Sequence, residues 1–435
     1  MRNTTGAPRV AALVLNSVNH DARVVKEADA LAKAGFEVRV IGLRDDRCGD
    51  PETVRPSGVR IVRIDHGWRG KTDRDSGPSG LLGRVRTFFR RAMAYRATSR
   101  LMRDALDRFA PVAVHCHDLT TLPIGAHWCR GHDERRLIFD SHELYEESAG
   151  MSPMMKRVWK RVLRRHASHV NGFITVNESI AAEHAKRYPT LPKAVVVMNA
   201  AERTASPPVD DGRLRAAAGV AAAERILLYQ GGYSRHRGLE DLVRSAAGLP
   251  DGWTLVLMGW GSIEAELRRI ADADPRSRDR VRFVPPAPQS ELCDWSAGAT
   301  LGVIPYENTC LNHWYCTPNK LWEYPSAGVP VLASPFPELR RAIESSGMGR
   351  LLPQPLTSES LGRLVADISE DDLAAMRAAC QTFVAAEHWG VYAARLVAAY
   401  RTWVLPSAPG EPRMRGPVTM SARAAAAARR SAARS

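Results

Sequence analysis

Strand-like and helix-like segments alternate along almost the whole chain, and this alternation restricts the fold more than any other feature. Short apolar runs are separated by segments in which apolar residues repeat with a helical period. In the first half, the runs lie at residues 10–15, 36–43, 59–64, 112–116, 136–140, 173–176 and 194–198. In the second half, they lie at residues 225–229, 254–258, 281–284, 300–304 and 329–333. This pattern is typical of parallel sheets whose strands are joined by crossover helices.

The strand series is interrupted once, which suggests two domains. A chain of 435 residues is also longer than one hydrophobic core usually serves. We predict a first domain at 1–199, an interdomain connection at 200–222, a second domain at 223–387, a C-terminal helix at 388–404 and a disordered Arg/Ala-rich tail at 405–435. Each domain is predicted to be a Rossmann-like, doubly wound α/β sheet, and the two sheets are predicted to face each other across a cleft.

Composition excludes several classes of protein. The chain is 45% hydrophobic and 25% charged, as is usual for a soluble globular protein. No run of eighteen apolar residues occurs, and residues 1–5 lead straight into the first strand, so we expect a cytoplasmic protein without a spanning helix. The seven cysteines are scattered without a CxxC pair, which argues against a disulfide framework and against a zinc site.

The formal charge of +14 calls for an anionic partner. Part of the excess lies in the tail, and two further parts lie at residues 84–103 and 156–165, which both have the pattern of basic amphipathic helices. Two interpretations stay open, a solvated helix face and docking on an anionic membrane surface at the inner face of the membrane. Nucleic acid is not an expected partner, because no aromatic residues are interleaved for base stacking.

The segment Thr317-Pro318-Asn319-Lys320-Leu321-Trp322-Glu323-Tyr324 has the strongest functional pattern. Pro318 suits the first position of a helix, whose free N–H groups and positive dipole end attract anions. Lys320 adds a charge and Asn319 an amide, while Glu323 offers acceptors suited to a ribose diol. Phosphate at one end and sugar hydroxyls at the other describe a nucleotide sugar. The alternative is a capped core helix with a surface lysine and glutamate.

Polar residues also follow the strands of the first half, where parallel sheets place their ligands. Asn16, Asp21 and Arg23 come after the first strand; Asp21 is a good N-cap, but the surplus of polar groups favours contact with an acceptor or a phosphate. Two later strands end in His115-Cys116-His117-Asp118 and in Asp140-Ser141-His142-Glu143. Histidines beside carboxylates could bind a metal, yet the spacing does not match a dedicated site, so we expect none. His142 is expected to meet the substrate.

Two glycine-containing segments follow strands of the second half. Gly231 and Gly232 precede Arg237 between a strand and a helix, where they allow the backbone to approach a diphosphate. The segment is neither a dinucleotide fingerprint nor a P-loop. Gly259-Trp260-Gly261-Ser262 is the matching turn after the next strand, and Gly261 is assigned to donor binding although glycine there is also ordinary turn chemistry. Trp260 is expected either against a nucleobase or packed on the surface.

Taken in order, these motifs resemble those of family 4 glycosyltransferases over about residues 8 to 400. The matching motifs are Asn16…Asp21-x-Arg23-Val24-x-Lys26-Glu27-Ala28, His117-Asp118, Asp140-Ser141-His142-Glu143-Leu144, Val197-Met198-Asn199, Tyr229-Gln230-Gly231-Gly232…Arg237-Gly238-Leu239 and Pro318-Asn319-Lys320-Leu321-Trp322-Glu323-Tyr324…Ala327-Gly328. The resemblance implies a GT-B architecture, a nucleotide-sugar donor held by the second domain, no metal or other cofactor, and transfer with retention of anomeric configuration.

The resemblance also implies roles for individual residues. His142 would lie beside the donor sugar and the acceptor, Arg237 and Lys320 would hold the diphosphate, and Glu323 would hold the ribose. The donor side also includes Gly231, Gly232, Gly261 and Asn319, and the acceptor side includes Asn16, Asp21, Arg23, His117, Asp118 and Asn199.

Two positions depart from the family pattern. Tyr315 stands where the family often has a glutamate that contacts the donor sugar, and Gly232 stands where it often has an arginine. The expected function is transfer of a sugar from a nucleoside diphosphate to a hydroxyl of a glycan or lipid-linked acceptor, in the synthesis of glycans, glycolipids or cell-envelope polysaccharide. The alternatives are a catalytically inactive sugar-nucleotide-binding subunit and a nucleotide-sugar epimerase or hydrolase on the same fold.

Overall fold

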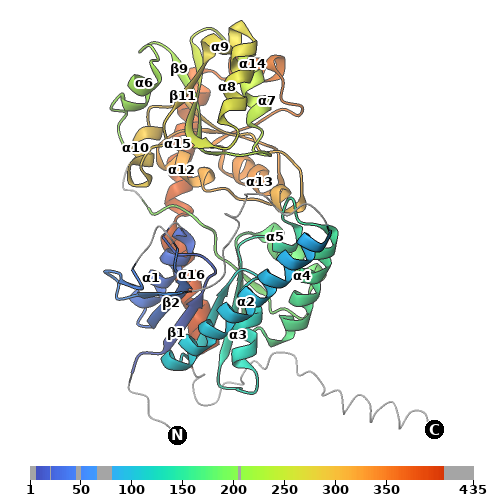
Figure 1. Cartoon of the computed structure of the whole chain (residues 1–435). Coiled ribbons are helices and arrows are strands. Elements are labelled where there is room, and N and C mark those ends of the chain that lie inside the picture. Colours follow the sequence, from blue (N-terminus) through green and yellow to red (C-terminus); the bar gives the residue numbers. More distant parts are fainter. Residues whose placement is uncertain (1–5, 20, 46–49, 66–80, 204–206, 406–435) are drawn as a thin grey trace, which may run out of the picture.

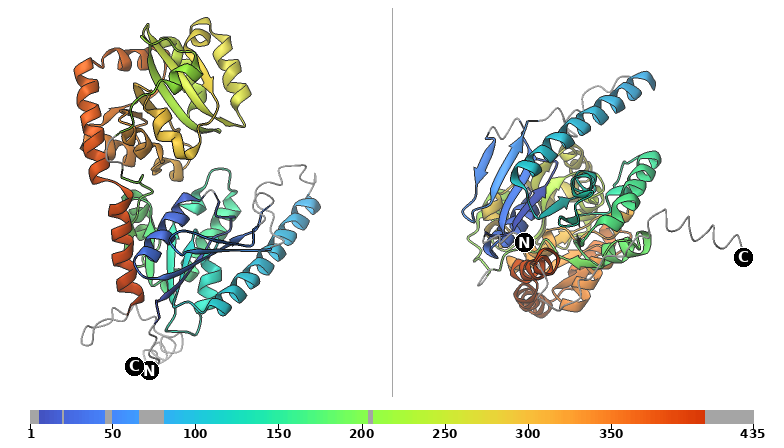
Figure 2. Two further views of the ribbon diagram at one scale, coloured as in Figure 1. Left: turned by 90° about the vertical axis from the view of Figure 1, so that its left-hand side faces the viewer. Right: turned by 90° about the horizontal axis from the view of Figure 1, so that it is seen from below.

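The computed structural model describes residues 6–19, 21–45, 50–65, 81–203 and 207–405. Two α/β domains, each built on a largely parallel sheet, are stacked end to end, and the C-terminal helix α16 (Trp389–Val404) returns to lie along the first domain (Figures 1 and 2). The predicted fold class is therefore confirmed. The predicted tail at 405–435 lies outside the described residues beyond Leu405.

The first sheet has eight strands in the order β3-β4-β2-β1-β5-β6-β7-β8. They are β1 (Arg9–Leu13), β2 (Glu37–Leu43), β3 (Glu52–Val54), β4 (Arg60–Ile64), β5 (Ala113–His117), β6 (Arg136–Ser141), β7 (Gly172–Thr175) and β8 (Ala194–Val196). All pairs are parallel except β3 with β4. The edge strand β3 was not predicted, because its three residues are exposed and form no apolar run.

Helices cover both faces of this sheet. They are α1 (Ala22–Lys33), α2 (Leu81–Phe109), α3 (Leu122–Cys129), α4 (Pro153–His166) and α5 (Glu178–Arg187), with short 3-10 helices η1 (Tyr145–Glu147) and η2 (Ala167–His169). Apolar residues of α2, α3 and α4 pack with Leu13 and Ile41 on one face of the sheet. Those of α1 and α16 pack with Val10 and Val40 on the other face. The alternation of inward side chains along each strand thus assigns α16 to the face that α1 covers.

The second sheet has six parallel strands in the order β11-β10-β9-β12-β13-β14. They are β9 (Arg225–Tyr233), β10 (Trp253–Gly261), β11 (Val281–Val284), β12 (Leu301–Ile304), β13 (Val331–Ala333) and β14 (Gly349–Leu351). The short strand β14 was not predicted. It holds only three residues, and none of them is fully buried.

Strands β9 and β10 extend further than their apolar runs indicate, which corrects two predictions. Gly231 and Gly232 lie inside β9, and Gly259 and Gly261 lie inside β10, so none of the four is in a loop. Glycine is required in this part of β10 because the backbones of β9 and β10 lie very close together. A Cβ at Gly259 would come within 2.0 Å of the Gly231 carbonyl oxygen, and one at Gly261 would come within 2.0 Å of the Tyr233 oxygen.

The helices of the second half surround this sheet. They are α6 (Arg213–Ala218), α7 (Leu239–Ser245), α8 (Glu264–Ala273), α9 (Pro275–Arg280), α10 (Leu292–Ser296), α11 (Leu311–Trp314), α12 (Lys320–Ser326), α13 (Pro337–Ser346), α14 (Ser358–Ala366) and α15 (Glu370–Ala386), with η3 (Ala246–Gly248) and η4 (Gln289–Glu291). Helix α12 begins at Lys320 with Asn319 as its N-cap, so Pro318 precedes the helix and is not its first residue. Within the described residues, no helix combines the length and apolarity needed to cross a bilayer.

Candidate active site

Two adjacent cavities lie where the carboxyl ends of the two sheets face each other. The smaller, of about 400 Å³, has walls from both domains, including Asp21, Arg23, His142 and Asn199 from the first. The larger, of about 510 Å³, has walls from the second domain. Both are lined by Arg237, Tyr306, Pro318 and Asn319. Because four residues belong to both walls, the two cavities are direct neighbours.

Polar contacts join the two domains around the smaller cavity. Asn199 Nδ2 donates to Asn319 Oδ1 at 2.9 Å, and Asn312 Nδ2 donates to Glu143 Oε2 at 2.6 Å. Asn177 Nδ2 donates to the carbonyl oxygen of Tyr315 at 2.7 Å. Tyr315 lines neither cavity, whereas Glu143 and Asn312 line the smaller one. Both acidic residues of this cavity wall, Asp21 and Glu143, therefore come from the first domain.

The larger cavity combines a buried ammonium with a carboxylate. Lys320 is only 9% exposed, and its Nζ lies 5.1 Å from the Tyr229 ring and 5.8 Å from the Tyr306 ring. Gly231 has φ 118° and lies directly under this amine, since a Cβ there would come 2.9 Å from Nζ. Glu323 Oε2 accepts a hydrogen bond from Gln230 Nε2 at 2.9 Å, which fixes the direction of the carboxylate. The cavity thus offers a cation at one end and fixed oxygen acceptors further along α12.

Arg237 stands between the two cavities. Its guanidinium lies 4.5 Å from the centroid of the Tyr306 ring and donates to the Tyr306 hydroxyl oxygen. Burial raises the pKa of Tyr306 to about 12, although Arg237 opposes this, so the hydroxyl keeps its proton near neutral pH. The neutral hydroxyl of Tyr306 therefore does not offset the charge of the guanidinium, which lines both cavities.

On the first-domain side, His142 is held between two carboxylates. Its Nε2 lies 3.1 Å from Asp140 Oδ2, its Nδ1 lies 3.5 Å from Asp118 Oδ2, and its backbone N–H donates to Asp118 Oδ1 at 3.3 Å. Asp118 has φ 63°, a left-handed conformation that is uncommon outside glycine and often marks functional sites.

These contacts determine the charge of His142. Burial lowers its pKa, but Asp118 and Asp140 outweigh burial and raise the pKa to about 9. The imidazole is therefore protonated at neutral pH, with both N–H groups directed at carboxylates. Because the folded pKa lies above the ordinary value of 6.5, the stabilisation from this cation is complete below pH 6.5 and is lost as pH rises through about 9.

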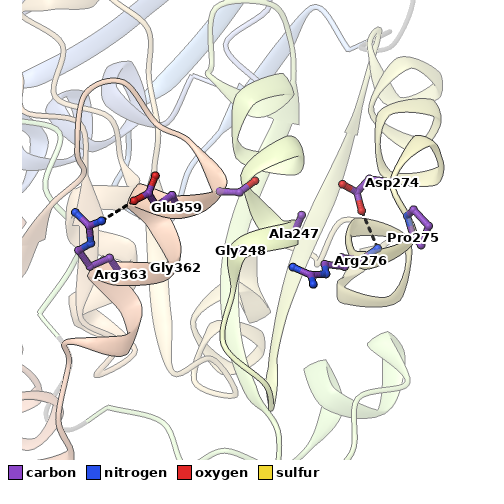
Figure 3. Close-up of a pocket in the computed structure, with 9 residues that line it drawn as sticks. Ala247, Gly248, Asp274, Pro275, Arg276, Glu359, Gly362 and Arg363 are labelled. Carbon is purple, nitrogen blue, oxygen red and sulfur yellow. Dashed lines mark hydrogen bonds and ion pairs between the residues drawn. The ribbon is translucent and has the colours of Figure 1, made fainter.

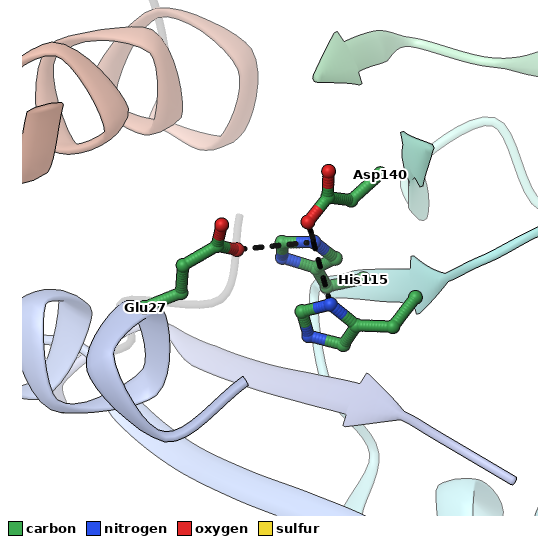
Figure 4. Close-up of side chains that lie close together, drawn as sticks. Glu27, His115 and Asp140 are labelled. Atoms are coloured by element: carbon green, nitrogen blue, oxygen red, sulfur yellow. Dashed lines mark ion pairs between the residues drawn. The ribbon is translucent and has the colours of Figure 1, made fainter. Parts of the chain in front are cut away.

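Beneath His142 lies a buried cluster of Glu27, His115, His117 and Asp140, whose nearest ligand atoms are all within 4.8 Å of one another (Figure 4). It is the only group in the described part of the chain with the composition and spacing of a metal site. However, Arg23 Nη2 lies 2.8 Å from Asp140 Oδ1 and 2.9 Å from Glu27 Oε1. The guanidinium thus supplies the positive charge that a metal ion would bring to these carboxylates.

Burial and mutual contacts determine the charges in this cluster. Burial raises the pKa of Glu27 to about 8, and burial together with His115 lowers the pKa of His117 to about 3. Burial also opposes ionisation of Asp140, but Arg23 and His142 prevail and hold its pKa well below the usual range. The cluster therefore contains an ionised Asp140 between cationic and neutral partners.

Comparison with known proteins identifies the family. Residues 21–200 match the family model described as "Glycosyl transferase 4-like domain", and residues 224–371 match the one described as "Glycosyl transferases group 1". This chain belongs to the family 4 glycosyltransferases. The resemblance inferred from the order of the motifs is therefore confirmed.

The glycosyltransferase is similar to two curated proteins over part of its length. It is 28% identical over 210 residues to D-inositol 3-phosphate glycosyltransferase 1 of Catenulispora acidiphila, covering 45% of this chain and 48% of that protein. It is 29% identical over 242 residues to D-inositol 3-phosphate glycosyltransferase of Thermobispora bispora, covering 52% of this chain and 54% of that protein. The chain thus spans about half the length of the curated relatives it matches.

Solved structures share the fold of the glycosyltransferase along nearly its whole length. Sucrose-phosphate synthase of Thermosynechococcus elongatus superposes with a TM-score of 0.70 at 18% identity, covering 91% of this chain and 98% of that one. HepE of Anabaena, solved in complex with UDP-glucose, superposes with a TM-score of 0.66 at 14% identity. The match covers 91% of this chain and 99% of that one.

The structure brings most of the predicted site residues of the glycosyltransferase together. Asp21, Arg23, His142, Asn199, Gly231, Arg237, Asn319, Lys320 and Glu323 all line one cavity or both. The residues that line neither are Asn16, His117, Asp118, Gly232 and Gly261. Asn16 instead donates to Asp21, and His117 is buried in a stack on His115.

The structure differs from the site prediction at two residues, one predicted and one not. Arg23 is only 5% exposed, and its guanidinium donates to Asp140 and to the Val197 carbonyl oxygen, so these nitrogens are engaged within the first domain. Tyr306 was not predicted as a site residue, yet it lines both cavities. Its position just after β12 could have indicated this role, because the carboxyl ends of the strands face the cleft.

A third cavity, of about 720 Å³, lies elsewhere on the second domain (Figure 3). It is lined by the start of α9, residues of α14 and residues of η3, and it shares no lining residue with the two cavities described above. Glu359 and Arg363 pair with each other along α14 at its edge. It is separate from the two cavities between the domains, and we assign it no function.

Proposed function

We propose that this glycosyltransferase moves a sugar from a nucleoside diphosphate to a hydroxyl of a glycan or lipid-linked acceptor, with retention of anomeric configuration. One observation carries the proposal. Arg237 lines both cavities, and Lys320 lies in the larger one with its Nζ 5.8 Å from the shared Tyr306 ring; Glu323 lines the larger cavity and His142 the smaller. This arrangement suits a ligand with its nucleoside in the larger cavity, its diphosphate at the junction and its sugar in the smaller. HepE, which shares the fold, was solved with UDP-glucose.

The proposed reaction breaks the bond between the anomeric carbon and the diphosphate and forms one to the acceptor oxygen. Negative charge grows on the departing diphosphate, so Lys320 and Arg237 stabilise the transition state. The protonated His142 adds a third positive charge near the sugar. Both of its N–H groups face carboxylates, so we assign it an electrostatic role. The proton of the acceptor hydroxyl passes to an oxygen of the departing phosphate.

The proposed mechanism uses no metal, because arginine and lysine meet the diphosphate charge. We expect EDTA to leave the turnover rate unchanged within experimental error, measured as release of nucleoside diphosphate in the presence of acceptor. As a control, EDTA should abolish turnover of a magnesium-dependent enzyme in the same buffer. Loss of activity that Mg²⁺ or Mn²⁺ restores would contradict this part of the proposal.

The function is tested in two steps with the full chain. A thermal-shift screen against UDP-, GDP-, ADP- and dTDP-sugars finds the donor, since a ligand at a hundredfold its Kd adds about 2.7 kcal/mol of stability. Acceptors are then supplied with that donor. Diphosphate release that requires an acceptor supports transfer, whereas release without one indicates a hydrolase, and conversion of the donor sugar indicates an epimerase. Donor binding with no turnover by any route indicates a sugar-nucleotide-binding subunit.

We further propose that the first domain docks on the inner face of a membrane. Helices α2 and α4 both pack against α3 and so lie on the same side of the first sheet (Figure 1). Large apolar side chains are exposed on both, with Met93 69% and Met154 68% exposed. The same two helices carry exposed arginines: Arg86, Arg91, Arg96 and Arg100 on α2, and Arg157, Arg161, Arg164 and Arg165 on α4. Basic side chains near anionic lipid contribute roughly 1 kcal/mol each, so several together suit peripheral attachment.

We expect the full chain to sediment with anionic vesicles at low salt, and less with neutral ones. Met93→Glu with Met154→Glu should weaken this binding, because two charges replace the exposed apolar side chains of α2 and α4. The matched control is Val54→Glu with Val209→Glu, which changes charge equally at exposed positions elsewhere. A chain ending at Val404 tests the tail. Equal binding to both vesicle types, or binding that disappears with the tail alone, would contradict the proposed surface.

A further inference from the structure

Tyr400 brings the end of the chain into the cluster beneath His142. It lies on α16, is fully buried, and its hydroxyl is 2.6 Å from His115 Nδ1. The two rings are also stacked, with centroids 5.9 Å apart. Helix α16 packs against α1, β7 and β8, so this tyrosine is an integral part of the first domain although it follows the second in sequence.

The contact with Tyr400 orients the ring of His115. With Nδ1 held by the hydroxyl, Nε2 faces the carboxyl groups of Asp140 and Glu27, at 3.6 Å from Oδ2 and 3.6 Å from Oε2 (Figure 4). Burial raises the pKa of Tyr400 well above its ordinary value and lowers that of His115, so both are neutral near pH 7. An oriented neutral imidazole beside Asp140 favours the ionised form of that carboxyl group.

Two contacts then connect His115 to His142. Asp140 Oδ2 is 3.1 Å from His142 Nε2. The ring of His117 stacks on His115 with centroids 4.1 Å apart, and its Nδ1 is also 3.1 Å from His142 Nε2. The Nε2–H group of His142 therefore faces Asp140 and His117, and His115 contacts both of these residues. A displaced His115 would disturb both contacts of His142.

We propose that Tyr400 is a positioning residue for His142, acting through His115 on Asp140 and His117. The proposal rests on the function proposed above, in which the His142 cation supports sugar transfer. Besides these groups, titratable and charged side chains from two elements bear on His142: Asp118 directly after β5, and Arg23 and Glu27 on α1. Replacing Tyr400 by phenylalanine alters none of these side chains, so a variant at this position isolates the contribution of its hydroxyl.

The test compares Tyr400→Phe with a matched control on the same helix, Tyr392→Phe. Both tyrosines are buried, and each hydroxyl bonds one side chain, which is Glu387 for Tyr392. The titration of His142 is followed by NMR in the histidine-labelled full chain, with its signal assigned by its absence in His142→Asn. The alkaline limb of the kcat profile and the donor KM are measured in parallel.

In Tyr400→Phe, we expect the His142 titration to move toward acid by about half to one pH unit, because a less well held Asp140 attracts the imidazolium less. The alkaline limb of kcat should move with it, and the donor KM should stay within about twofold, since no group of the larger cavity is touched. Tyr392→Phe should change neither the His142 titration nor the alkaline limb of kcat. This should hold even if Tyr392→Phe lowers the thermal stability as much as Tyr400→Phe does.

Three results would overturn the proposal: no shift in Tyr400→Phe, an equal shift in Tyr392→Phe, or about one equivalent of a transition metal in the purified full chain. A bound metal would mean that metal coordination holds the cluster together. The NMR titration does not depend on turnover. Absence of sugar transfer by the unaltered protein would therefore count against the proposed function, while the titration would still decide the role of Tyr400.

Discussion

Replacing His142 by asparagine is expected to lower kcat by about 10²–10³-fold, the usual effect of removing one preorganised group that stabilises transition-state charge. The imidazolium lies at the wall of the smaller cavity, and its charge is maintained by Asp118 and Asp140. In the unaltered protein, kcat should fall as pH rises through about 9, where the cation is lost, and the variant should lack this alkaline limb. Steady-state kinetics from pH 6 to about 10 measure both effects.

The control for this variant is His132→Asn. His132 is exposed and pairs with Glu134 at 3.1 Å, at the opposite end of β6 from His142. It should leave kcat and its pH dependence unchanged. Removing His142 takes a cationic partner from Asp118 and leaves Asp140 with Arg23, so the melting temperature of each variant must be measured alongside. A His142 variant that folds and retains kcat within about threefold of the unaltered protein would remove this residue from the mechanism.

Replacing Lys320 by methionine is expected to weaken donor binding by about 1.5–3 kcal/mol, or roughly 10–150-fold in Kd, because a charge-assisted contact to phosphate is lost. Methionine keeps most of the buried stem between Tyr229 and Tyr306, so the change removes mainly the charge. Glu323→Ala should weaken the same binding by a similar amount through the ribose. Calorimetric titration with the donor found in the thermal-shift screen measures both.

The matched control is Lys186→Met, at an exposed position of α5 in the first domain. It loses the same charge away from either cavity and should leave donor affinity unchanged. Arg237→Ala should behave like Lys320→Met, and raising the salt concentration should reduce its effect. If Lys320→Met and Glu323→Ala both bind the donor normally, the larger cavity is not the donor site.

The structure shows the surroundings of Tyr315 and Gly232, the two positions that depart from the family pattern. Tyr315 is held by its backbone to Asn177, while Glu143 presents a carboxylate to the smaller cavity with Asn312 as its partner. Gly232 lies within β9, so an arginine there would extend from a strand. Recognition of the donor sugar is therefore expected to differ from that in family members with the usual glutamate.

Local pattern was enough to predict the fold class and most strands. The core strands are buried apolar runs whose lengths are visible in the sequence, and β11 begins and ends at the residues that its run indicates. Pattern failed where strands are short and exposed, as in β3, and where glycines extend a strand, as in β9 and β10. Glycine has no side chain to show which face it packs on, so its place in a strand follows only from the neighbouring strand.

The motifs likewise indicated which residue types gather at the cleft, because parallel strands bring their carboxyl ends to one edge. They did not show which of those residues face a ligand. Arg23 follows the first strand as the motif requires, but turns inward to Asp140, 117 positions away. Tyr400 lies 285 positions from His115 and carries no local signal at all. Such pairings depend on strand order and on how α16 packs across the sheet. Periodicity within one segment contains no information about either, so only the tertiary structure decides them.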